Sequence, residues 1–369
     1  MKVKQRPQDF RVEEKSSLSG GSEGEFALYR LEKSGLGTVE AIALVVRSWQ
    51  LVRRDVAFSG LKDRYGVTGQ IISIRRGPSR NLKGRGLKLN YLGRSPRPAS
   101  RGSLLGNRFR IVLRDLSRGE ADQVAQRARD AERDGYPDYY DDQRFGSLRG
   151  TRGRFVARAL LDGNTEEALF LAIACPARED RSRVKKRRRL LARHWGDWGG
   201  LADRLDSSVE RRICARLQKG AAFQKAYREL DPALRSIHLA AYQAHLFNGA
   251  LREAVAKGPS HRGADGPYIF HEGALPESLH VSIPLASSEA PPHPLLDEML
   301  AREGVDRSDL ARLPFRAGER RAVVVPEKLS VGEPEPDSEN RGRFALELDF
   351  DLRPGSYATM LVKRCTWDF

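Results

Sequence analysis

The sequence predicts an α/β protein of the α+β type, with one sheet domain that a long helix-rich segment interrupts. Segments that alternate polar and apolar residues, as half-buried strands do, dominate the N-terminal part. From about Gly146 to Gly258 the pattern becomes mainly helical, and alternation returns near the C-terminus. With 369 residues and 40% hydrophobic content, the chain can build two domains, or one domain with a large insertion.

The N-terminal part contains three segments with strand-like alternation. They cover residues 25–33, 69–75 and 107–114. Two helices are predicted in the same part, over residues 39–49 and 121–133. Thr38 is expected to cap the first helix, with Glu40 in its first turn, where an acid suits the helix dipole. Gly135 follows the second helix and is expected to end it.

The middle and C-terminal parts follow different patterns. Asn164 and Glu167 match a capping box at the start of a helix. Residues 258–294 are rich in Gly, Pro and Ser with short strand-like pieces, and a short helix over residues 295–303 is predicted to follow. A last strand is predicted over residues 343–352, where apolar side chains occupy alternate positions.

The chain is strongly basic. Lys and Arg number 65 against 49 acids, which gives a formal net charge of +16 and a pI near 10. Proteins with such a surplus most often bind phosphate, in nucleic acid, ribosomes or anionic membranes. The charge gathers in residues 94–101, 143–161 and 181–193, the last with eight basic residues. One basic run is usually a solvated face, but three in one chain indicate a phosphate-binding surface.

Several classes of protein are disfavoured by what the sequence lacks. No apolar run reaches the roughly 20 residues of a membrane-spanning helix, and the first residues lack a signal-peptide core. Cys175, Cys214 and Cys365 are far apart and odd in number, which argues for reduced thiols and a cytoplasmic protein. No zinc-type cluster, P-loop or dinucleotide fingerprint occurs, so neither a metal nor a nucleotide cofactor is expected. No heptad pattern demands a partner, so we expect a monomer.

One acid stands out in a basic, turn-prone segment. The stretch FSGLKDRYGVTGQ places Asp63 between Lys62 and Arg64. Adjacent cations favour the charged carboxylate, so Asp63 is expected to stay ionised and to suit a nucleophile or an anionic base. Gly60, Asp63 and Gly66 are also ordinary turn residues, and on spacing alone a solvated turn is the simpler interpretation.

Three other stretches are candidates for function. PDYYDDQRFG, residues 137–146, joins three aromatic residues to a Gln and an Arg. Such side chains hold a base removed from its stack, although a strand of core aromatics explains the pattern equally well. AAYQAHLFN, residues 240–248, has the spacing of a buried helical stripe, with Gln243 and Asn248 as polar supports. PGSYAT, residues 354–359, is typical of a hairpin or strand-entry turn.

Taken together and in this order, these stretches resemble the TruD family of tRNA pseudouridine synthases. The resemblance rests on six motifs between residues 4 and 359: KQRPQDFRVEE, FSGLKDRYGVTGQ, NRFRIVLR, DYYDDQRFG, AAYQAHLFN and GSYAT. Each motif alone is weak, but six in the right order are specific. The resemblance implies a catalytic pseudouridine synthase domain with a mixed, mostly antiparallel sheet, built from residues 1–152 and 320–369. An inserted, helix-rich TRUD-type domain is expected over residues 153–319.

The resemblance also implies a reaction. Such an enzyme detaches uracil from C1′ of its ribose, turns it and rejoins it through C5, without a cofactor or a metal. The implied substrate is tRNA, with the target base flipped out of its stack. The family's catalytic aspartate falls on Asp63, and Lys4 falls on the lysine that keeps this carboxylate ionised and oriented. Tyr140 stands where the family has Phe, and we expect its ring to stack on the target base.

Further substrate-binding residues are carried over from the same motifs. They are Phe10, Lys62, Arg64, Asn107, Asp138, Gln143, Arg144, Phe145, Gln243, Asn248 and Ser356. This chain departs from the family at two more positions, where Asp138 replaces Asn and Asp141 replaces Gly. A second acid near Asp63 would raise one of the two pKa values, or would need a cationic partner of its own.

Two other functions fit the residues. A non-catalytic RNA-binding or RNA-folding factor on the same scaffold would tolerate Asp63→Asn without any loss. A hydrolase or glycosidase would need a second carboxylate roughly 5 to 10 Å from Asp63, and would release free uracil.

Overall fold

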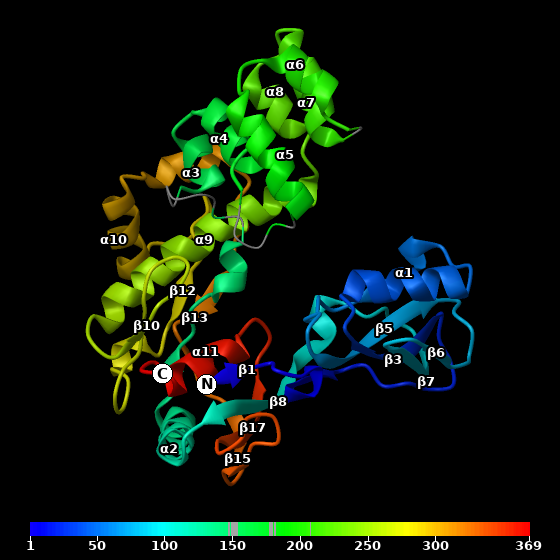
Figure 1. The fold of residues 1–369 in the computed structure, drawn as a ribbon, viewed down its shortest axis with the longest axis vertical. Coiled ribbons are helices and arrows are strands. Elements are labelled where there is room, and N and C mark those ends of the chain that lie inside the picture. Colours follow the sequence, from blue (N-terminus) through cyan, green and yellow to red (C-terminus); the bar gives the residue numbers. More distant parts are fainter. Residues whose placement is uncertain (147, 149–153, 177–179, 181, 207) are drawn as a thin grey trace. The chain divides into compact units, whose positions relative to one another are not determined.

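The structure is a computed structural model that describes residues 1–146, 148, 154–176, 180, 182–206 and 208–369. It divides into two compact units, which Figure 1 shows coloured along the chain. The sheet unit comprises Met1–Tyr136, Gly273–Leu275 and Val324–Phe369, and the helical unit comprises Pro137–Glu272 and Pro276–Val323. Both residues of the expected domain boundary, 152 and 153, lie outside the described residues, and so do Arg149 and Arg181 of the basic clusters.

The sheet unit is built on one eleven-stranded sheet with the path β15-β17-β8-β2-β5-β3-β7-β6. Strands β2 and β5 run parallel, and the other neighbours along the path run antiparallel, which gives the mixed, mostly antiparallel sheet that was predicted. The short strands β1, β4 and β16 pair at its sides. The strands are β1 (Lys2–Val3), β2 (Phe10–Ser16), β3 (Phe26–Ser34), β4 (Val56–Phe58), β5 (Val67–Arg75), β6 (Leu82–Gly84), β7 (Leu87–Ser95), β8 (Leu104–Leu116), β15 (Glu327–Val331), β16 (Glu335–Pro336) and β17 (Phe344–Leu352).

Two helices of the sheet unit pack on this sheet, and a third packs on one of them. They are α1 (Thr38–Ser48), α2 (Arg118–Asp134) and α11 (Ala358–Cys365). Helix α1 buries Ile42 and Val45 against β3 and β5, and α2 packs on β8, β17 and α11. Because side chains alternate across a strand, the registers place the residues that face α1 and α2 on the same side of the sheet. The opposite face carries mainly charged side chains.

The predicted elements of the sheet unit agree with the structure, with two corrections. Helix α1 begins at Thr38 with Gly37 as its cap residue, because the Thr38 hydroxyl is used elsewhere: it accepts from Lys62 N at 2.9 Å and contacts Gln70 Oε1 at 3.0 Å. The turn at Pro354 leads into helix α11, so the expected hairpin or strand entry is wrong. The apolar residues after this turn follow helical spacing and are buried.

The helical unit has its own core. A cluster of buried Leu, Ala and Ile side chains joins helices α3 to α8, and the long α9 packs against α3 and α10. Its helices are α3 (Val156–Leu161), α4 (Thr165–Ile173), α5 (Ser182–Arg193), α6 (Trp198–Arg204), α7 (Val209–Gln218), α8 (Phe223–Arg228), α9 (Pro232–Val255) and α10 (Pro294–Glu303). The predicted cap of α4 is confirmed, because Asn164 Oδ1 accepts from Glu167 N at 3.0 Å.

Short strands and 3-10 turns complete the described chain. The remaining strands are β9 (Tyr136–Pro137), β10 (Ser260–His261), β11 (Tyr268–Ile269), β12 (Ser282–Pro284), β13 (Glu319–Arg321) and β14 (Val323–Val324). The 3-10 turns cover Pro7–Asp9, Arg53–Asp55, Arg101–Ser103, Asp142–Phe145, Glu277–Leu279 and Arg307–Arg312. Strands β12 and β13 pair antiparallel within the helical unit.

Candidate active site

Asp63 lies in the loop between β4 and β5, which is held by a buried lysine. Lys33, at the end of β3 and only 2% exposed, donates to the backbone oxygens of Asp63 at 2.6 Å, Leu36 at 2.8 Å and Lys62 at 3.2 Å. Burial lowers the pKa of Lys33 to about 8, although the Asp63 charge opposes this shift. The loop backbone is therefore fixed from below, while the Asp63 side chain stays partly open to solvent.

The Asp63 carboxylate has two donors. Lys4 Nζ donates to Oδ2, and the Tyr65 backbone N–H donates to Oδ1 at 3.0 Å. Burial raises the pKa of Asp63, but the hydrogen bonds from Lys4 and Tyr65 and the charges of Lys4 and Lys33 outweigh it and lower the pKa below its usual value. Both side chains of the ion pair keep about a quarter of their surface exposed, 24% for Lys4 and 27% for Asp63. The site thus presents an ionised, oriented carboxylate.

Lys4 reaches this position from a strained backbone. Its φ of 60° lies in the left-handed region, which costs a residue other than glycine about 1–3 kcal/mol. Its ammonium lies 3.9 Å from the centre of the Phe10 ring, a cation–π contact that helps to hold it. Lys4 is therefore directed at Asp63 by the ring and by its backbone conformation together.

The two cations beside Asp63 in sequence point elsewhere, which corrects the expectation that they ionise it. Lys62 Nζ lies 3.1 Å from Glu14 Oε2 and donates to Asn107 Oδ1 at 2.6 Å. Arg64 donates to both oxygens of Glu40 at 2.7 Å. Successive side chains of a turn point in different directions, so Lys62 and Arg64 do not contact the Asp63 carboxylate although they adjoin it in the sequence.

Glu14 and Lys33 were not identified from the sequence, although a signal was present. Both occupy inward positions of alternating strands, Glu14 after Phe10 and Val12, and Lys33 after Leu31. A charged residue at an inward position must be paired, because burying a lone charge is costly. Glu14 supports the Asp63 loop through its ion pair with Lys62, and Lys33 supports it through hydrogen bonds to the loop's backbone oxygens.

Three aromatic rings line the same sheet face beside Lys4. Phe10, Phe109 and Phe350 come from β2, β8 and β17, with ring centres 6.3 Å apart for the first pair and 5.7 Å for the second. All three residues are less than 10% exposed. Of these only Phe10 was predicted as a site residue, because Phe109 and Phe350 look like ordinary core positions in alternating strands.

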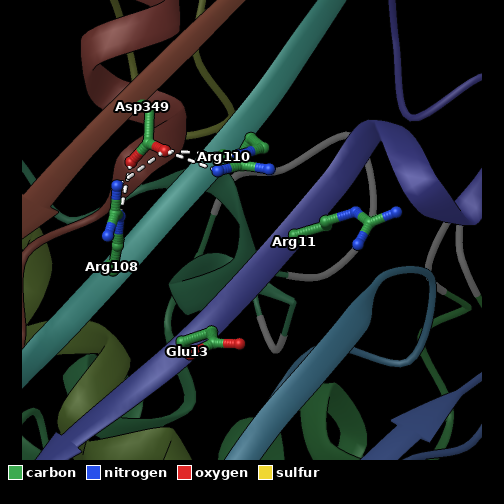
Figure 2. A pocket seen from close by; sticks show the side chains of 5 residues that line it. All are labelled: Arg11, Glu13, Arg108, Arg110 and Asp349. Atoms are coloured by element: carbon green, nitrogen blue, oxygen red, sulfur yellow. Dashed lines mark hydrogen bonds and ion pairs between the residues drawn. The ribbon is translucent and has the colours of Figure 1, made fainter. Parts of the chain in front are cut away.

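The opposite face of the same strands carries a hollow of about 200 Å³ (Figure 2). Arg108 and Arg110 from β8 both donate to Asp349 of β17, and Arg11 and Glu13 of β2 complete the lining. By the alternation of strand side chains, the hollow lies across the sheet from Lys62, Glu14 and Asn107. No residue predicted for the site lines it.

Tyr140 lies in the helical unit, at the centre of a polar and aromatic cluster. Asn248 clamps its backbone, accepting from Tyr140 N at 2.8 Å and donating to Tyr140 O at 2.9 Å. The guanidinium of Arg320 lies 4.3 Å from the centre of the Tyr140 ring, and that of Arg144 lies 5.3 Å away. Asp138 forms an ion pair with Arg320 at 2.7 Å, so this acid has a cationic partner of its own.

The remaining predicted residues divide into buried supports and surface positions. Gln243 is buried and donates to the Ala286 and Arg316 backbone oxygens at 2.8 and 2.9 Å, as the polar-support interpretation expects. Phe145 is buried and packs edge-on against Phe155. Gln143 is exposed in the 3-10 turn, and Ser356 lies in the turn before α11.

The described residues contain neither a cluster of metal ligands nor a membrane-spanning helix. Over the part of the chain that the structure describes, no three His, Cys, Asp or Glu side chains gather as metal ligands do. None of the helices in the same residues is long and apolar enough to cross a membrane.

Comparison with known proteins identifies the family. The family model described as tRNA pseudouridine synthase D (TruD) matches residues 1–284. A Methanococcus maripaludis protein named Probable tRNA pseudouridine synthase D 1 is 29% identical over 99% of both chains. The tRNA pseudouridine synthase D of Aquifex aeolicus is 27% identical over 99% of this chain and 97% of its own length.

A solved structure shows that the fold is shared. A crystal structure from Methanosarcina mazei, described as a TruD protein, matches with a TM-score of 0.70 and 23% identity, over 98% of this chain and 92% of that one. The predicted α+β fold is confirmed by this likeness and by the sheet described above. Since the family model covers most of the chain and the motifs around Asp63 fall within it, this protein belongs to the TruD family of tRNA pseudouridine synthases.

Proposed function

We propose that this protein converts a uridine of tRNA to pseudouridine with Asp63 as its catalytic group. In this isomerisation the bond from C1′ to N1 breaks and a bond from C1′ to C5 forms; C5 loses its proton and N1 gains one. The observation that carries the proposal is the Asp63 carboxylate, which is partly exposed, oriented by Lys4 and given a lowered pKa. An ionised carboxylate suits attack on the sugar or the base, or assistance in forming a glycal-like intermediate.

The sheet unit is then the catalytic domain, and the helical unit is the inserted domain. Asp63, Lys4 and Asn107 all belong to the sheet unit. We propose that the site is supported, but the substrate not contacted, by Lys62, Arg64 and Asn107, because their polar groups contact other side chains. Tyr140, in the helical unit, is proposed to stack on the flipped base.

Basic side chains of α5 are proposed to bind the tRNA backbone. Arg183 and Arg187 of this helix form ion pairs with Asp206 and Glu210. The same helix exposes Lys186, Arg189 and Arg193, and their spacing of three and four residues places them on one helix face. A row of this kind suits the evenly spaced phosphates of an RNA strand.

The test is Asp63→Asn, assayed for pseudouridine formation in tRNA by mapping and for tRNA binding. We expect the rate to fall by about 10³-fold or more while binding changes little, because the amide keeps the shape but cannot act as nucleophile or base. Full activity in this variant would refute the proposal, and unchanged RNA folding activity without any pseudouridine would favour an RNA-folding factor. Free uracil as a product would favour a hydrolase.

The place of action and the assembly state are part of the same proposal. Cys214 and Cys365 are buried thiols, which suits a reducing compartment such as the cytoplasm. We propose a cytoplasmic monomer. Cell fractionation, together with light scattering of the purified protein with and without tRNA, tests both statements.

A further inference from the structure

Asp138 is a buried acid where the TruD motif has an uncharged Asn, and its partner is Arg320. The residue is only 4% exposed, and the side chains of the pair keep 6% and 9% of their surface. Arg320 contacts Asp138 twice, through the ion pair at 2.7 Å and through Nε, which donates to the Asp138 backbone oxygen at 2.8 Å. Two contacts to one residue fix both the position and the plane of the guanidinium.

The same guanidinium lies over the Tyr140 ring, at 4.3 Å from its centre. Phe247 meets this ring edge-on at 5.5 Å, and the Asn248 amide holds the Tyr140 backbone on both sides. A planar cation fixed over a ring, with a second ring perpendicular to it, restricts rotation of the side chain. Tyr140 is thus held by its backbone, by the perpendicular Phe247 ring and by the Arg320 guanidinium, with Arg144 farther away at 5.3 Å.

We propose that Arg320 is a positioning residue for the reaction, which sets the plane of Tyr140 and is itself held by Asp138. The proposal rests on the proposed function, in which Tyr140 stacks on the target base. Asp138 then acts through Arg320 and takes no part in chemistry at Asp63. The exchange of the motif's Asn for Asp138 is accounted for by Arg320, because a cation buried at this place needs an anion beside it.

The stacking geometry explains why a positioning residue matters. A flipped base stacks well only on a ring of defined plane, and displacement of a reacting group by about 1 Å costs on the order of 100-fold in rate. Arg320 supports the ring without reaching the base itself. Loss of Arg320 is therefore expected to reduce kcat for pseudouridine formation more than it raises KM for tRNA.

The experiment compares Arg320→Ala, Asp138→Asn and the double variant with the parent chain. Arg320→Ala leaves a buried, unpaired acid, so we expect a lower melting temperature together with a loss of kcat of about 10- to 100-fold. The double variant removes the unpaired charge as well, and we expect its melting temperature to recover while kcat stays low. Arg321→Ala is the matched control, since Arg321 is exposed and next to Arg320 on β13.

Two results would overturn the proposal. One is a double variant that regains both stability and kcat, which would make Arg320 merely the neutraliser of Asp138. The other is unchanged kcat in Arg320→Ala. A second measurement separates this inference from the proposed reaction: the ¹³Cζ NMR signal of Tyr140, assigned with Tyr140→Phe, is expected to shift in Arg320→Ala and to stay in Arg321→Ala. A parent chain that makes no pseudouridine would refute the proposed reaction. An unchanged Tyr140 signal in Arg320→Ala would refute the positioning role of Arg320.

Discussion

At the scale of single residues, the pairing of Lys4 with Asp63 sets the charge of the site. Burial alone would raise the Asp63 pKa, and the donors Lys4 and Tyr65, together with the Lys4 and Lys33 charges, bring it below its usual value. The carboxylate therefore stays ionised at neutral pH. Lys4 contributes to this through both its hydrogen bond and its charge.

Lys4→Met is expected to move the acid limb of the pH profile. A carboxyl whose pKa is lowered is ionised above that pKa and loses its activity as the pH falls through it. Removal of Lys4 takes away a hydrogen bond and a charge that lower the Asp63 pKa, while burial still raises it, so the acid limb of kcat/KM should move to higher pH. Steady-state rates between pH 4 and 8 measure this, with Lys2→Met as the control at an exposed lysine. An unchanged profile would contradict the assigned role of Lys4.

The buried pair of Lys62 and Glu14 is expected to stabilise the Asp63 loop rather than to take part in the reaction. The side chains are 7% and 1% exposed, so Lys62→Met leaves Glu14 without its cation. The predicted loss is about 3–5 kcal/mol in the free energy of unfolding. Urea unfolding measures this loss. The control is Arg64→Gln, at a more exposed residue of the same loop, which should cost less than about 1 kcal/mol. Equal losses in the two variants would show that Lys62 is not specially paired.

At the scale of elements, a charged histidine joins the helices of the helical unit. His245 of α9 contacts Asp265 at 2.7 Å and Glu303, the last residue of α10, at 3.3 Å. Burial lowers the pKa of His245, but the two carboxylates raise it by more, so that the pKa rises from 6.5 to about 9. The groups that face this cluster are Asp265, Glu303, Arg158, Arg252 and Tyr242. The contact between α9 and α10 thus depends on a protonated imidazole.

This cluster predicts that the helical unit loses stability at alkaline pH. A group whose pKa is raised from 6.5 to about 9 contributes its full stabilisation below pH 6.5 and loses it as the pH rises through 9. The loss can reach about 3 kcal/mol. Thermal unfolding from pH 6 to 9.5 should show it, and His245→Gln should abolish this dependence. His194→Gln, at a histidine outside the cluster, should leave it unchanged.

Sheet alternation at the element scale also separates neighbours in sequence by function. Asn107 faces Lys62 and the Asp63 loop, whereas Arg108 faces Asp349 in the hollow on the other side. The same separation holds for Glu14 and Glu13 on β2. In a strand beneath the active site, only every second side chain therefore faces the site. Variants of Arg108 or Arg110, whose side chains face the other way, serve as negative controls for the site.

At the scale of the whole molecule, the surplus of positive charge governs how tRNA is bound. The net charge of +16 supplies a field that favours any polyanion, and local rows of cations decide where phosphates rest. The exposed face of α5 is one such row. Its contribution is separable from catalysis, because none of its residues lies in the loop of Asp63.

Replacement of Lys186, Arg189 and Arg193 by Gln is expected to weaken tRNA binding without loss of kcat. Each phosphate contact adds about 0.7–0.9 to the slope of log K against log salt, so the slope should fall by about 2 to 3. Titration of tRNA between 50 and 300 mM KCl measures it. The control is Arg183→Gln with Asp206→Asn, an exposed ion pair between α5 and the residue that follows the end cap of α6. An unchanged slope would show that α5 does not contact the RNA.

The sequence by itself determined strands β3, β5, β8 and β17, several helices, the basic charge and the motif with Asp63. These features depend on local periodicity, turn residues and composition, which can be recognised from residues that lie close together in the sequence. The alternation over residues 343–352 predicts β17, and Asn164 with Glu167 predicts the start of α4. Six motifs in order were also sufficient to indicate the family, which the comparisons confirmed.

Only the tertiary structure decided most partners of the charged residues. Lys4 and Asp63 are 59 residues apart, and Arg320 and Asp138 are 182 apart, so no spacing rule connects either pair; the family resemblance alone implied the first. Lys62 and Arg64, which stand next to Asp63 in the sequence, turn away to Glu14 and Glu40. The physical reason is that a buried charge takes the partner that strand register and chain crossing bring within about 4 Å, and those depend on the packing of the whole chain.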